Sequence, residues 1–526
     1  MIIMNIIKET QSLCPECLKF LSATIFEDDN KVWIKKKCSE HGEFLDLYWG
    51  DYEMYKKAMK FYHDGKGIEN PNIELKNPCP MNCGLCKMHT SHTALGNIVV
   101  TNRCDLECFY CFFFAKKMGY VYEPSLEEIR KMLKTMREEK PVHTNALQLT
   151  GGEPLMRNDI VDIIKIAKEE GFEHVQLNTN GIRLSQSLEF TKKVREAGVN
   201  TIYLSFDGTT PKTNPKNHWE IPRLFENCRK ANMKVVLVPT VINTVNDGDV
   251  GNIIKFGVKN TDVVSGVNYQ PVSLVGRITK ADVKKFRITI PDVIKKIEEQ
   301  TNGSITKEDW YPVPTVVPIT HYFEALTNMP KFELTAHPAC GMATYLFLDG
   351  NKIIPLPQFF DVKGFVEFLE ELANQAKGVT GKVYTTLKIV TKLNSFIDSK
   401  KQPKDLKFAK IMFNVIRYGN YDALRKLHQK SLFVGMMHFM DLWNYDIERV
   451  RKCCIHYAQP DGRIIPFCAF NVIPQWYRDE IQEKHSISIP EWEKRADKKL
   501  ETEIYKRNIK ELEADPLYRK TYDGFI

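Results

Sequence analysis

GNIVVTNRCDLECFYC, residues 96–111, places three cysteines directly after an apolar run of strand-forming residues. The run at 96–102 predicts a buried strand, and Cys104, Cys108 and Cys111 lie in the loop that follows it. Three thiolates at this spacing bind three corners of a [4Fe–4S] cube and leave one iron without a protein ligand. A zinc knuckle that takes a distant fourth ligand is the alternative for such a loop.

Strands and helices alternate around this loop, from Ala94 to about Val272. Ile160, Ile163, Ile164 and Ala167 recur with helical spacing, and a capping box runs from Ser125 to Glu128 before another helix. Short loops and right-handed crossovers then predict an α/β fold, a parallel sheet curved into a partial, TIM-like (β/α)6 barrel. The six strand candidates are 96–102, 146–150, 174–180, 201–208, 234–241 and 263–272.

Small and acidic residues follow these strands, where a barrel binds its ligands. The glycines of Gly151-Gly152-Glu153-Pro154 allow the backbone to approach a ligand, and the acid can bind an ammonium group. The vacant iron can chelate the amino and carboxylate groups of S-adenosylmethionine (SAM), which one electron then cleaves to a radical. The residues expected around SAM are Tyr110, Gly151, Gly152, Glu153, Asn178, Asn180, Ser205 and Asp207.

The CxxxCxxC motif at 104–111 and the GGE motif at 151–153 resemble those of the radical SAM superfamily. The resemblance covers residues 94–272. It implies that Gly151, Gly152 and Glu153 bind the methionyl amine. It also implies that Ser205 and Asp207 lie near the ribose or carboxylate of SAM.

Cysteines outside this loop predict further metal sites, because reducing compartments disfavour disulfides. The chain has 14 cysteines, and Cys228, alone in a helical pattern, is expected to be a buried small side chain. A mononuclear iron or zinc site could form from two CxxC pairs, as in rubredoxin, or from Cys14, Cys17, Cys38 and one more ligand. His41, His89 and His92 could substitute as ligands, but each is expected to support a ligand or to be structural. The remaining candidate ligands are Cys14, Cys17, Cys38, Cys79, Cys83, Cys86, Cys340, Cys453, Cys454 and Cys468.

A weak internal repeat lies downstream of the barrel. Cys340 precedes the Asp-Gly pair at 349–350, and Cys454 precedes the pair at 461–462, each flanked by apolar residues. The pattern predicts two hairpins that follow metal-ligand loops, although short hairpins also resemble each other by chance. The cysteines left over from a four-sulfur site suffice for one or two auxiliary [4Fe–4S] clusters, but not for two with four cysteines each.

Composition divides the chain into modules. Residues 365–450 carry broad apolar helical faces, which suit either an ordinary helical subdomain or a tunnel or membrane-facing surface. The expected domains are 1–92 (cysteine-rich, metal-binding), 93–275 (barrel), 276–364 (first auxiliary-cluster module), 365–450 (apolar helical insert) and 451–526 (second cysteine module and C-terminal helices).

Charge and hydropathy limit the partners. The formal net charge is +8, but basic residues are interspersed with acids, and no Lys/Arg stripe accompanies the N-terminal cysteines. Nucleic acid is therefore not an expected partner. The start, MIIMNIIKETQSLCPEC, lacks a signal peptide, and no stretch is long enough to span a bilayer, the best candidate being 432–443. We expect a cytoplasmic protein that meets the membrane only peripherally.

Taken whole, the chain resembles the archaeal tetraether lipid synthases through CPEC…CSEHG at 14–42, CPMNCGLCKMHTSHT at 79–93 and the two downstream modules. This resemblance implies C–C coupling of the terminal carbons of archaeal diether lipid chains. Ferredoxin or flavodoxin is the expected electron donor. The alternative is methylation of a pterin-type cofactor, with a second SAM as the methyl donor.

Overall fold

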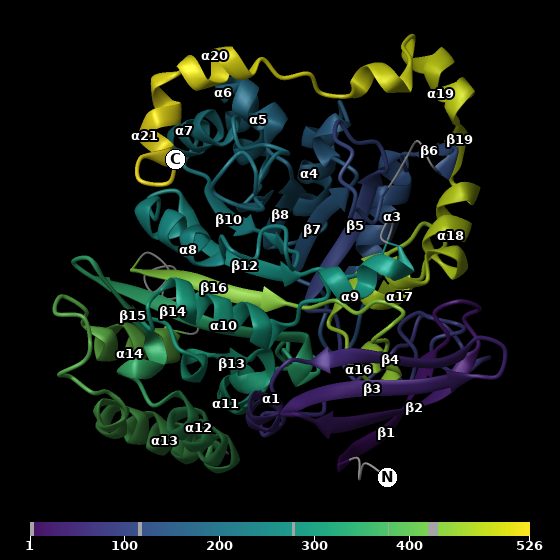
Figure 1. The fold of residues 1–526 in the computed structure, drawn as a ribbon. Helices are drawn as coiled ribbons and strands as arrows, with labels where there is room; N and C mark the ends of the chain where they lie inside the picture. The colour runs from purple at the N-terminus through teal and green to yellow at the C-terminus, as the bar shows by residue number, and fades with distance from the viewer. Residues whose placement is uncertain (1–4, 114–117, 276–278, 377, 419–429) are drawn as a thin grey trace.

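Six parallel strands form the centre of the computed structural model, in the predicted order (Figure 1). They are β5 (Leu95–Thr101), β7 (Ala146–Gly151), β8 (His174–Thr179), β9 (Thr201–Ser205), β10 (Lys234–Val238) and β12 (Val264–Pro271), with the short β11 (Thr240–Val241) beside β12. The structure describes residues 5–113, 118–275, 279–376, 378–418 and 430–526. The first residues of the chain and the predicted boundary at 276 lie outside these ranges.

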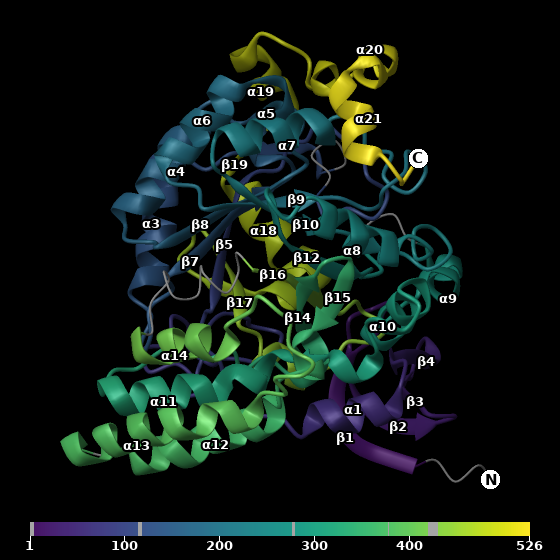
Figure 2. The same ribbon diagram turned by 90° about the vertical axis from the view of Figure 1, so that its left-hand side faces the viewer.

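Helices cover the outer face of this sheet (Figure 2). Ser125 forms the predicted capping box with Glu128 at the start of α3, and the apolar stripe of α4 is buried against the strands. The (β/α)6 prediction is therefore confirmed. The helices are α3 (Leu126–Arg137), α4 (Ile160–Glu169), α5 (Ile182–Gln186), α6 (Leu188–Ala197), α7 (Ile221–Lys230) and α8 (Val250–Lys259).

The sheet continues beyond the barrel at both edges. On one side β16 (Ser431–Met437) runs parallel to β12, and β14 (Gly341–Asp349) pairs with β16, β13 (Tyr311–Pro312) and β15 (Lys352–Pro355). On the other side β17 (Ile455–Ala458) runs parallel to β5 and turns back into β18 (Ile464–Pro466). The two hairpins predicted at the Asp-Gly pairs are β14–β15 and β17–β18.

Strand β16 corrects the prediction of a helical insert over 365–450. The first half of the apolar stretch considered for a membrane span lies in this strand, which is largely buried between β14 and β12. A strand that is covered on both faces has a continuous apolar sequence, so periodicity cannot distinguish it from a helix. Among the residues that the structure describes, no helix combines the length and apolar character needed to cross a membrane.

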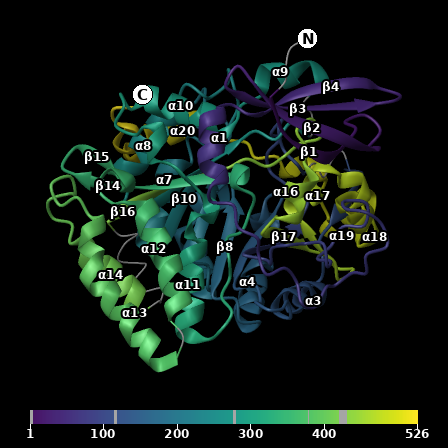
Figure 3. The same ribbon diagram turned by 90° about the horizontal axis from the view of Figure 1, so that it is seen from below.

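The rest of the insert joins a separate helical layer (Figures 2 and 3). Its apolar faces enclose a core that includes Phe365, Leu369 and Phe408, as expected of an ordinary helical subdomain. Val383, Leu387 and Val390 of α13 remain exposed. The helices of this layer are α11 (Val317–Thr327), α12 (Val362–Gln375), α13 (Gly378–Lys392) and α14 (Phe408–Tyr418). The preceding α9 (Val283–Phe286) and α10 (Ile290–Gln300) lie apart from it, and α10 contacts α8.

The N-terminal residues form an antiparallel sheet of β1 (Asn5–Leu13), β2 (Phe20–Asp28), β3 (Lys31–Cys38) and β4 (Gly42–Trp49), followed by α1 (Tyr52–Met59). The buried Arg287 fixes this sheet to the body, because it pairs with Asp46 of β4 and, at 2.7 Å, with Asp441.

The C-terminal segment runs across the top of the barrel in Figure 1. Glu503 pairs with Arg103 at 2.6 Å, and Tyr505 N donates to Asp105 O at 3.0 Å, so this segment contacts the cysteine loop directly. In this segment β19 (Ser486–Ser488) pairs with β6 (Tyr120–Tyr122). The helices from residue 447 to the end of the chain are α16 (Ile447–Arg451), α17 (Phe467–Val472), α18 (Arg478–Lys484), α19 (Ile489–Ala496), α20 (Ile509–Ala514) and α21 (Pro516–Tyr522).

Candidate active site and metal centres

A cavity of about 210 Å³ lies inside the barrel. The three cysteines of the 104–111 loop line it together with strand-end residues, and Phe439 and Phe467 form part of its wall. Among the predicted site residues, those that line it are Cys104, Cys108, Cys111, Tyr110, Gly151, Gly152, Glu153, Asn178, Asn180 and Ser205.

The cysteine loop fits an iron–sulfur cluster. Backbone amides donate to two of its sulfurs, Leu106 N to Cys104 Sγ at 3.4 Å and Phe113 N to Cys111 Sγ at 3.3 Å. Such amide hydrogen bonds stabilise sulfur ligands that carry negative charge. Burial raises the pKa of all three thiols, that of Cys111 to about 11, so a bound metal is needed to deprotonate them at neutral pH.

The glycines of the GGE turn allow its backbone to pack closely against neighbouring backbone. A Cβ at Gly151, where φ is +149°, would lie 2.0 Å from Thr101 O, and one at Gly152 would lie 2.1 Å from Arg103 O. Gly152 N instead donates to Thr101 O at 2.8 Å. The missing side chains thus let this turn pack against the backbone that leads into the cysteine loop.

Glu153 is buried and organises the neighbouring strand end. Its carboxylate accepts hydrogen bonds from Leu155 N at 3.0 Å, Thr179 Oγ1 at 2.7 Å and Asn180 N at 2.8 Å. Burial and the nearby Asp105 carboxylate raise the pKa of Glu153. Because these three donors come from two strand ends, Glu153 fixes the loops after β7 and β8 relative to each other.

Asp207 is held by a cation that the sequence analysis missed. Lys216 Nζ lies 2.7 Å from Asp207 Oδ2 and 2.9 Å from Tyr110 Oη, while Thr240 N donates to Asp207 Oδ1 at 3.0 Å. Tyr110 Oη also donates to Asp207. Lys216 and Tyr110 face the cavity, whereas Asp207 lies behind them.

Polar strand residues were also missed. Gln148, Tyr203 and Gln270 line the cavity from β7, β9 and β12. A polar residue at an inward position of a buried strand is the signal that could have identified them, because such a residue needs a partner. Lys216 lies in an irregular stretch that carries no comparable pattern.

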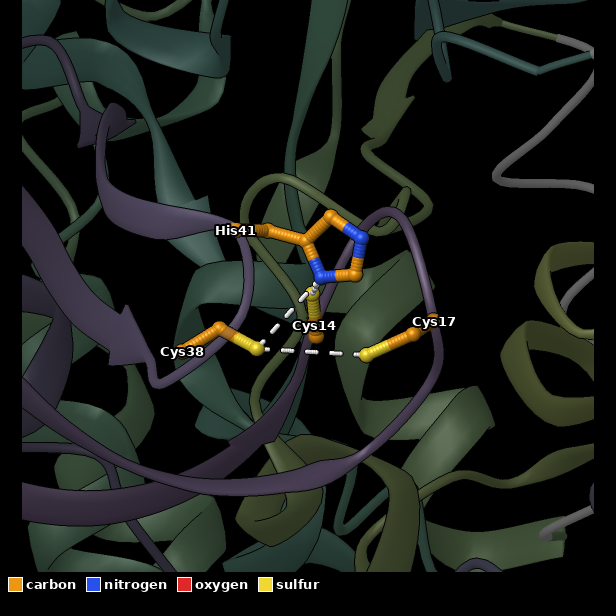
Figure 4. Close-up of side chains that lie close together, drawn as sticks. All are labelled: Cys14, Cys17, Cys38 and His41. Atoms are coloured by element: carbon orange, nitrogen blue, oxygen red, sulfur yellow. Dashed lines mark hydrogen bonds between the residues drawn. The ribbon is translucent and has the colours of Figure 1, made fainter.

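A separate metal centre lies in the N-terminal sheet (Figure 4). One ligand atom from each of Cys14, Cys17, Cys38 and His41 falls within 4.8 Å of the others. Three thiolates and an imidazole are a donor set typical of structural zinc. His41 therefore occupies the fourth position, the ligand role that the sequence analysis considered but did not favour, and the alternative built from two CxxC pairs is not formed.

Seven further cysteines lie in two adjacent groups. Cys79, Cys83 and Cys86, the 79–86 group, line one small cavity with Arg451. The second group, the 340–468 group, contains Cys340, Cys453, Cys454 and Cys468. Its thiols lie close enough to interact electrostatically. Three buried donors near these groups have no hydrogen-bond partner in the described part of the chain: Arg449 Nη1, Arg451 Nε and Tyr445 Oη. Each therefore lacks an acceptor, which the sulfide of a bound cluster could supply. Cys228 is buried in α7, as expected.

Comparison with known proteins agrees with this architecture. Residues 98–257 match the radical SAM superfamily, and residues 6–50 match the HMPTM N-terminal zinc ribbon domain. The 7,8-dihydro-6-hydroxymethylpterin dimethyltransferase of Methanocaldococcus jannaschii is 49% identical over 93% of this chain and 97% of its own length. A probable GTP 3′,8-cyclase of the same organism is 27% identical over 40% of this chain and 68% of its own.

A solved structure of HydG, a maturase of the [FeFe]-hydrogenase, covers 40% of this chain and 50% of its own at 15% identity. Its TM-score of 0.32 is too low to support an argument.

The prediction of diether lipid coupling at a membrane surface is wrong. The relative that spans nearly the whole chain is a pterin dimethyltransferase, and the N-terminal region matches the zinc ribbon domain named HMPTM. The cysteine motifs behind the lipid prediction do not separate the two activities. The chain belongs to the radical SAM superfamily and, within it, to the family of the Methanocaldococcus jannaschii dimethyltransferase.

Proposed function

We propose that this chain is a radical SAM C-methyltransferase that acts on a pterin-type compound. The observation that carries this proposal is the 49% identity to the Methanocaldococcus jannaschii dimethyltransferase, which extends over 97% of that protein. Because the similarity includes both the zinc ribbon and the barrel, the shared activity is expected to use the whole chain.

Cys104, Cys108 and Cys111 would hold the [4Fe–4S] cluster that binds SAM. Bound there, cluster and SAM would supply the radical chemistry that removes a hydrogen atom from the substrate. A second SAM would supply the methyl group, with the electrons for both steps coming from the external reductant. Glu153 keeps the loops around this site in register, and Lys216 gives the cavity a buried cation, 8% exposed, next to Tyr110.

The cavity supports a flat, polar heterocycle as the substrate. Gln148, Tyr203 and Gln270 offer amide and phenol groups that match the alternating donors and acceptors on a pterin edge. Phe439 and Phe467, stacked with ring centroids 3.7 Å apart, supply an apolar wall that excludes water. Exclusion of water limits the loss of a reactive radical to solvent.

We further propose that the 79–86 and 340–468 groups each hold an auxiliary [4Fe–4S] cluster and that the N-terminal site holds zinc. Three cysteines in the first group leave one position for another ligand. The buried donors without partners around both groups support this assignment.

The test is anaerobic reconstitution with iron and sulfide, followed by reaction with 7,8-dihydro-6-hydroxymethylpterin, reductant or reduced flavodoxin, and SAM labelled in its methyl group. Mass spectrometry should find labelled methyl groups on the pterin, with 5′-deoxyadenosine as co-product. Cys108→Ser should abolish both products, whereas Cys228→Ser, a matched change at a buried cysteine outside every group, should retain them. Production of 5′-deoxyadenosine without any methylated pterin would reject this substrate.

A further inference from the structure

Arg449, on α16, is a buried arginine whose contacts are incomplete. It is 2% exposed. Its Nε donates to Cys340 Sγ at 3.3 Å and its Nη2 donates to His438 O at 2.7 Å, but Nη1 is buried without a partner among the residues that the structure describes. Buried arginines normally satisfy their planar fork of donors.

Its charge is also uncompensated by carboxylates. In the part of the chain that the structure describes, no acidic side chain pairs with this guanidinium, whose electrostatic partners are Cys340, Cys468 and Tyr48. The equally buried Arg287 shows the usual arrangement, since it lies between Asp46 and Asp441. An isolated buried cation is costly, so Arg449 requires an anion nearby.

The 340–468 group can supply that anion when it binds metal, because a metal-bound thiol is deprotonated outright. Thiolates and sulfides of a cluster would both compensate the guanidinium and accept the hydrogen bond that Nη1 lacks.

We propose that Arg449 is the buried counter-ion of the iron–sulfur cluster in the 340–468 group. Its hydrogen bond to Cys340 positions the cluster, and its positive charge makes the cluster easier to reduce. The inference rests on the proposed presence of a cluster there. A fixed positive charge in a medium of low dielectric favours the reduced state of the cluster, which is more negative by one electron.

Reconstituted full-length chains that carry Cys104→Ala, Cys108→Ala and Cys111→Ala isolate the auxiliary signals. In this background Arg449→Met should shift the midpoint potential of one cluster to more negative values in an EPR-monitored titration. It should also weaken iron binding, by about the 10-fold expected when a hydrogen-bond partner of a metal ligand is lost. Arg449→Lys keeps the charge without the fork, so its potential should lie between those of the parent and Arg449→Met.

Arg287→Met is the matched control. It removes a buried arginine that pairs with carboxylates, so it should lower the free energy of unfolding and leave the midpoint potentials of both auxiliary clusters unchanged. Parental potential and iron content in folded Arg449→Met would overturn the inference. Parental iron content and spectra in a Cys340→Ala, Cys468→Ala double variant would instead show that no cluster is bound there, which defeats the cluster assignment and the inference with it.

Discussion

Single residues at the GGE turn connect the strand ends to the cysteine loop. Gly151 takes a φ of +149° and leaves no room for a Cβ beside Thr101 O. Glu153 collects three donors from the adjoining loops. The turn therefore acts as a rigid support for the loop that carries Cys104.

Gly151→Ala should damage this support. The added methyl group meets backbone rather than a flexible side chain, and the strained conformation alone costs about 1–3 kcal/mol. We expect a lower free energy of unfolding together with loss of the SAM-dependent EPR signal of the cluster. Gly248→Ala, where a Cβ meets nothing within 4 Å, is the control. A fully loaded, parent-like Gly151→Ala protein would contradict this account.

Glu139 provides a pH-dependent contribution to stability. Thr93 N donates to its carboxylate at 2.7 Å, and burial raises its pKa to about 7. The folded pKa exceeds the model-peptide value, so the protonated form is favoured in the native state. This stabilisation is complete below about pH 4.5 and is lost as the pH rises through about 7, a difference on the order of 3 kcal/mol.

Glu139→Gln should flatten this dependence. Urea midpoints measured between pH 5 and pH 8 should fall with pH in the parent more steeply than in the variant. The exposed neighbour Glu138, changed to Gln, should leave the parental slope unaltered. Identical slopes in the parent and in Glu139→Gln would show that Glu139 does not titrate in this range.

At the scale of elements, the N-terminal sheet depends on its metal centre. The loops that follow β1 and β3 supply Cys14, Cys17 and His41, and β3 ends at Cys38, so one bound ion would join the ends of these strands (Figure 4). Cys14→Ser should lower the zinc content by one per chain and abolish hydrogen-exchange protection in β1–β4. Protection in β7 should stay at the parental level and serves as the internal control. Unchanged exchange in β1–β4 after zinc loss would argue against a structural role.

The sequence predicts correctly those elements in which the spacing of apolar residues reflects which face is buried. Alternating strands and helices gave all six barrel strands, and the Asp-Gly pairs gave both hairpins. Strand β16 was missed because burial on both faces removes the alternation that marks a strand. Lys216 and Arg449 were missed for another reason: their roles come from contacts with Asp207 and Cys340, which are distant or irregularly placed in the sequence.

At the scale of the whole molecule, the chain between β16 and β17 joins opposite edges of the central sheet. The two strands extend the barrel beyond β12 and β5, respectively. The connection contains α16 with Arg449 and ends at Cys453 and Cys454. Phe439 at its start stacks on Phe467 after β18, so the same segment links the two edges and carries two cysteines of the 340–468 group.

Phe467→Ala should therefore separate radical formation from product formation. Removing one ring of the Phe439–Phe467 stack opens the cavity wall to solvent. It also removes the ring contact with Phe112, while the backbone hydrogen bonds to the sulfurs of Cys104 and Cys111 remain. We expect the ratio of 5′-deoxyadenosine to methylated pterin to rise several-fold, because more radicals are lost before the methyl group is added. Phe467→Leu, which refills most of the volume, should restore the ratio in part. Phe368→Ala, in the distant helical layer, controls for general destabilisation. A parental ratio in folded Phe467→Ala would mean that the wall does not protect the reaction, and that the two sheet edges are joined for structural reasons alone.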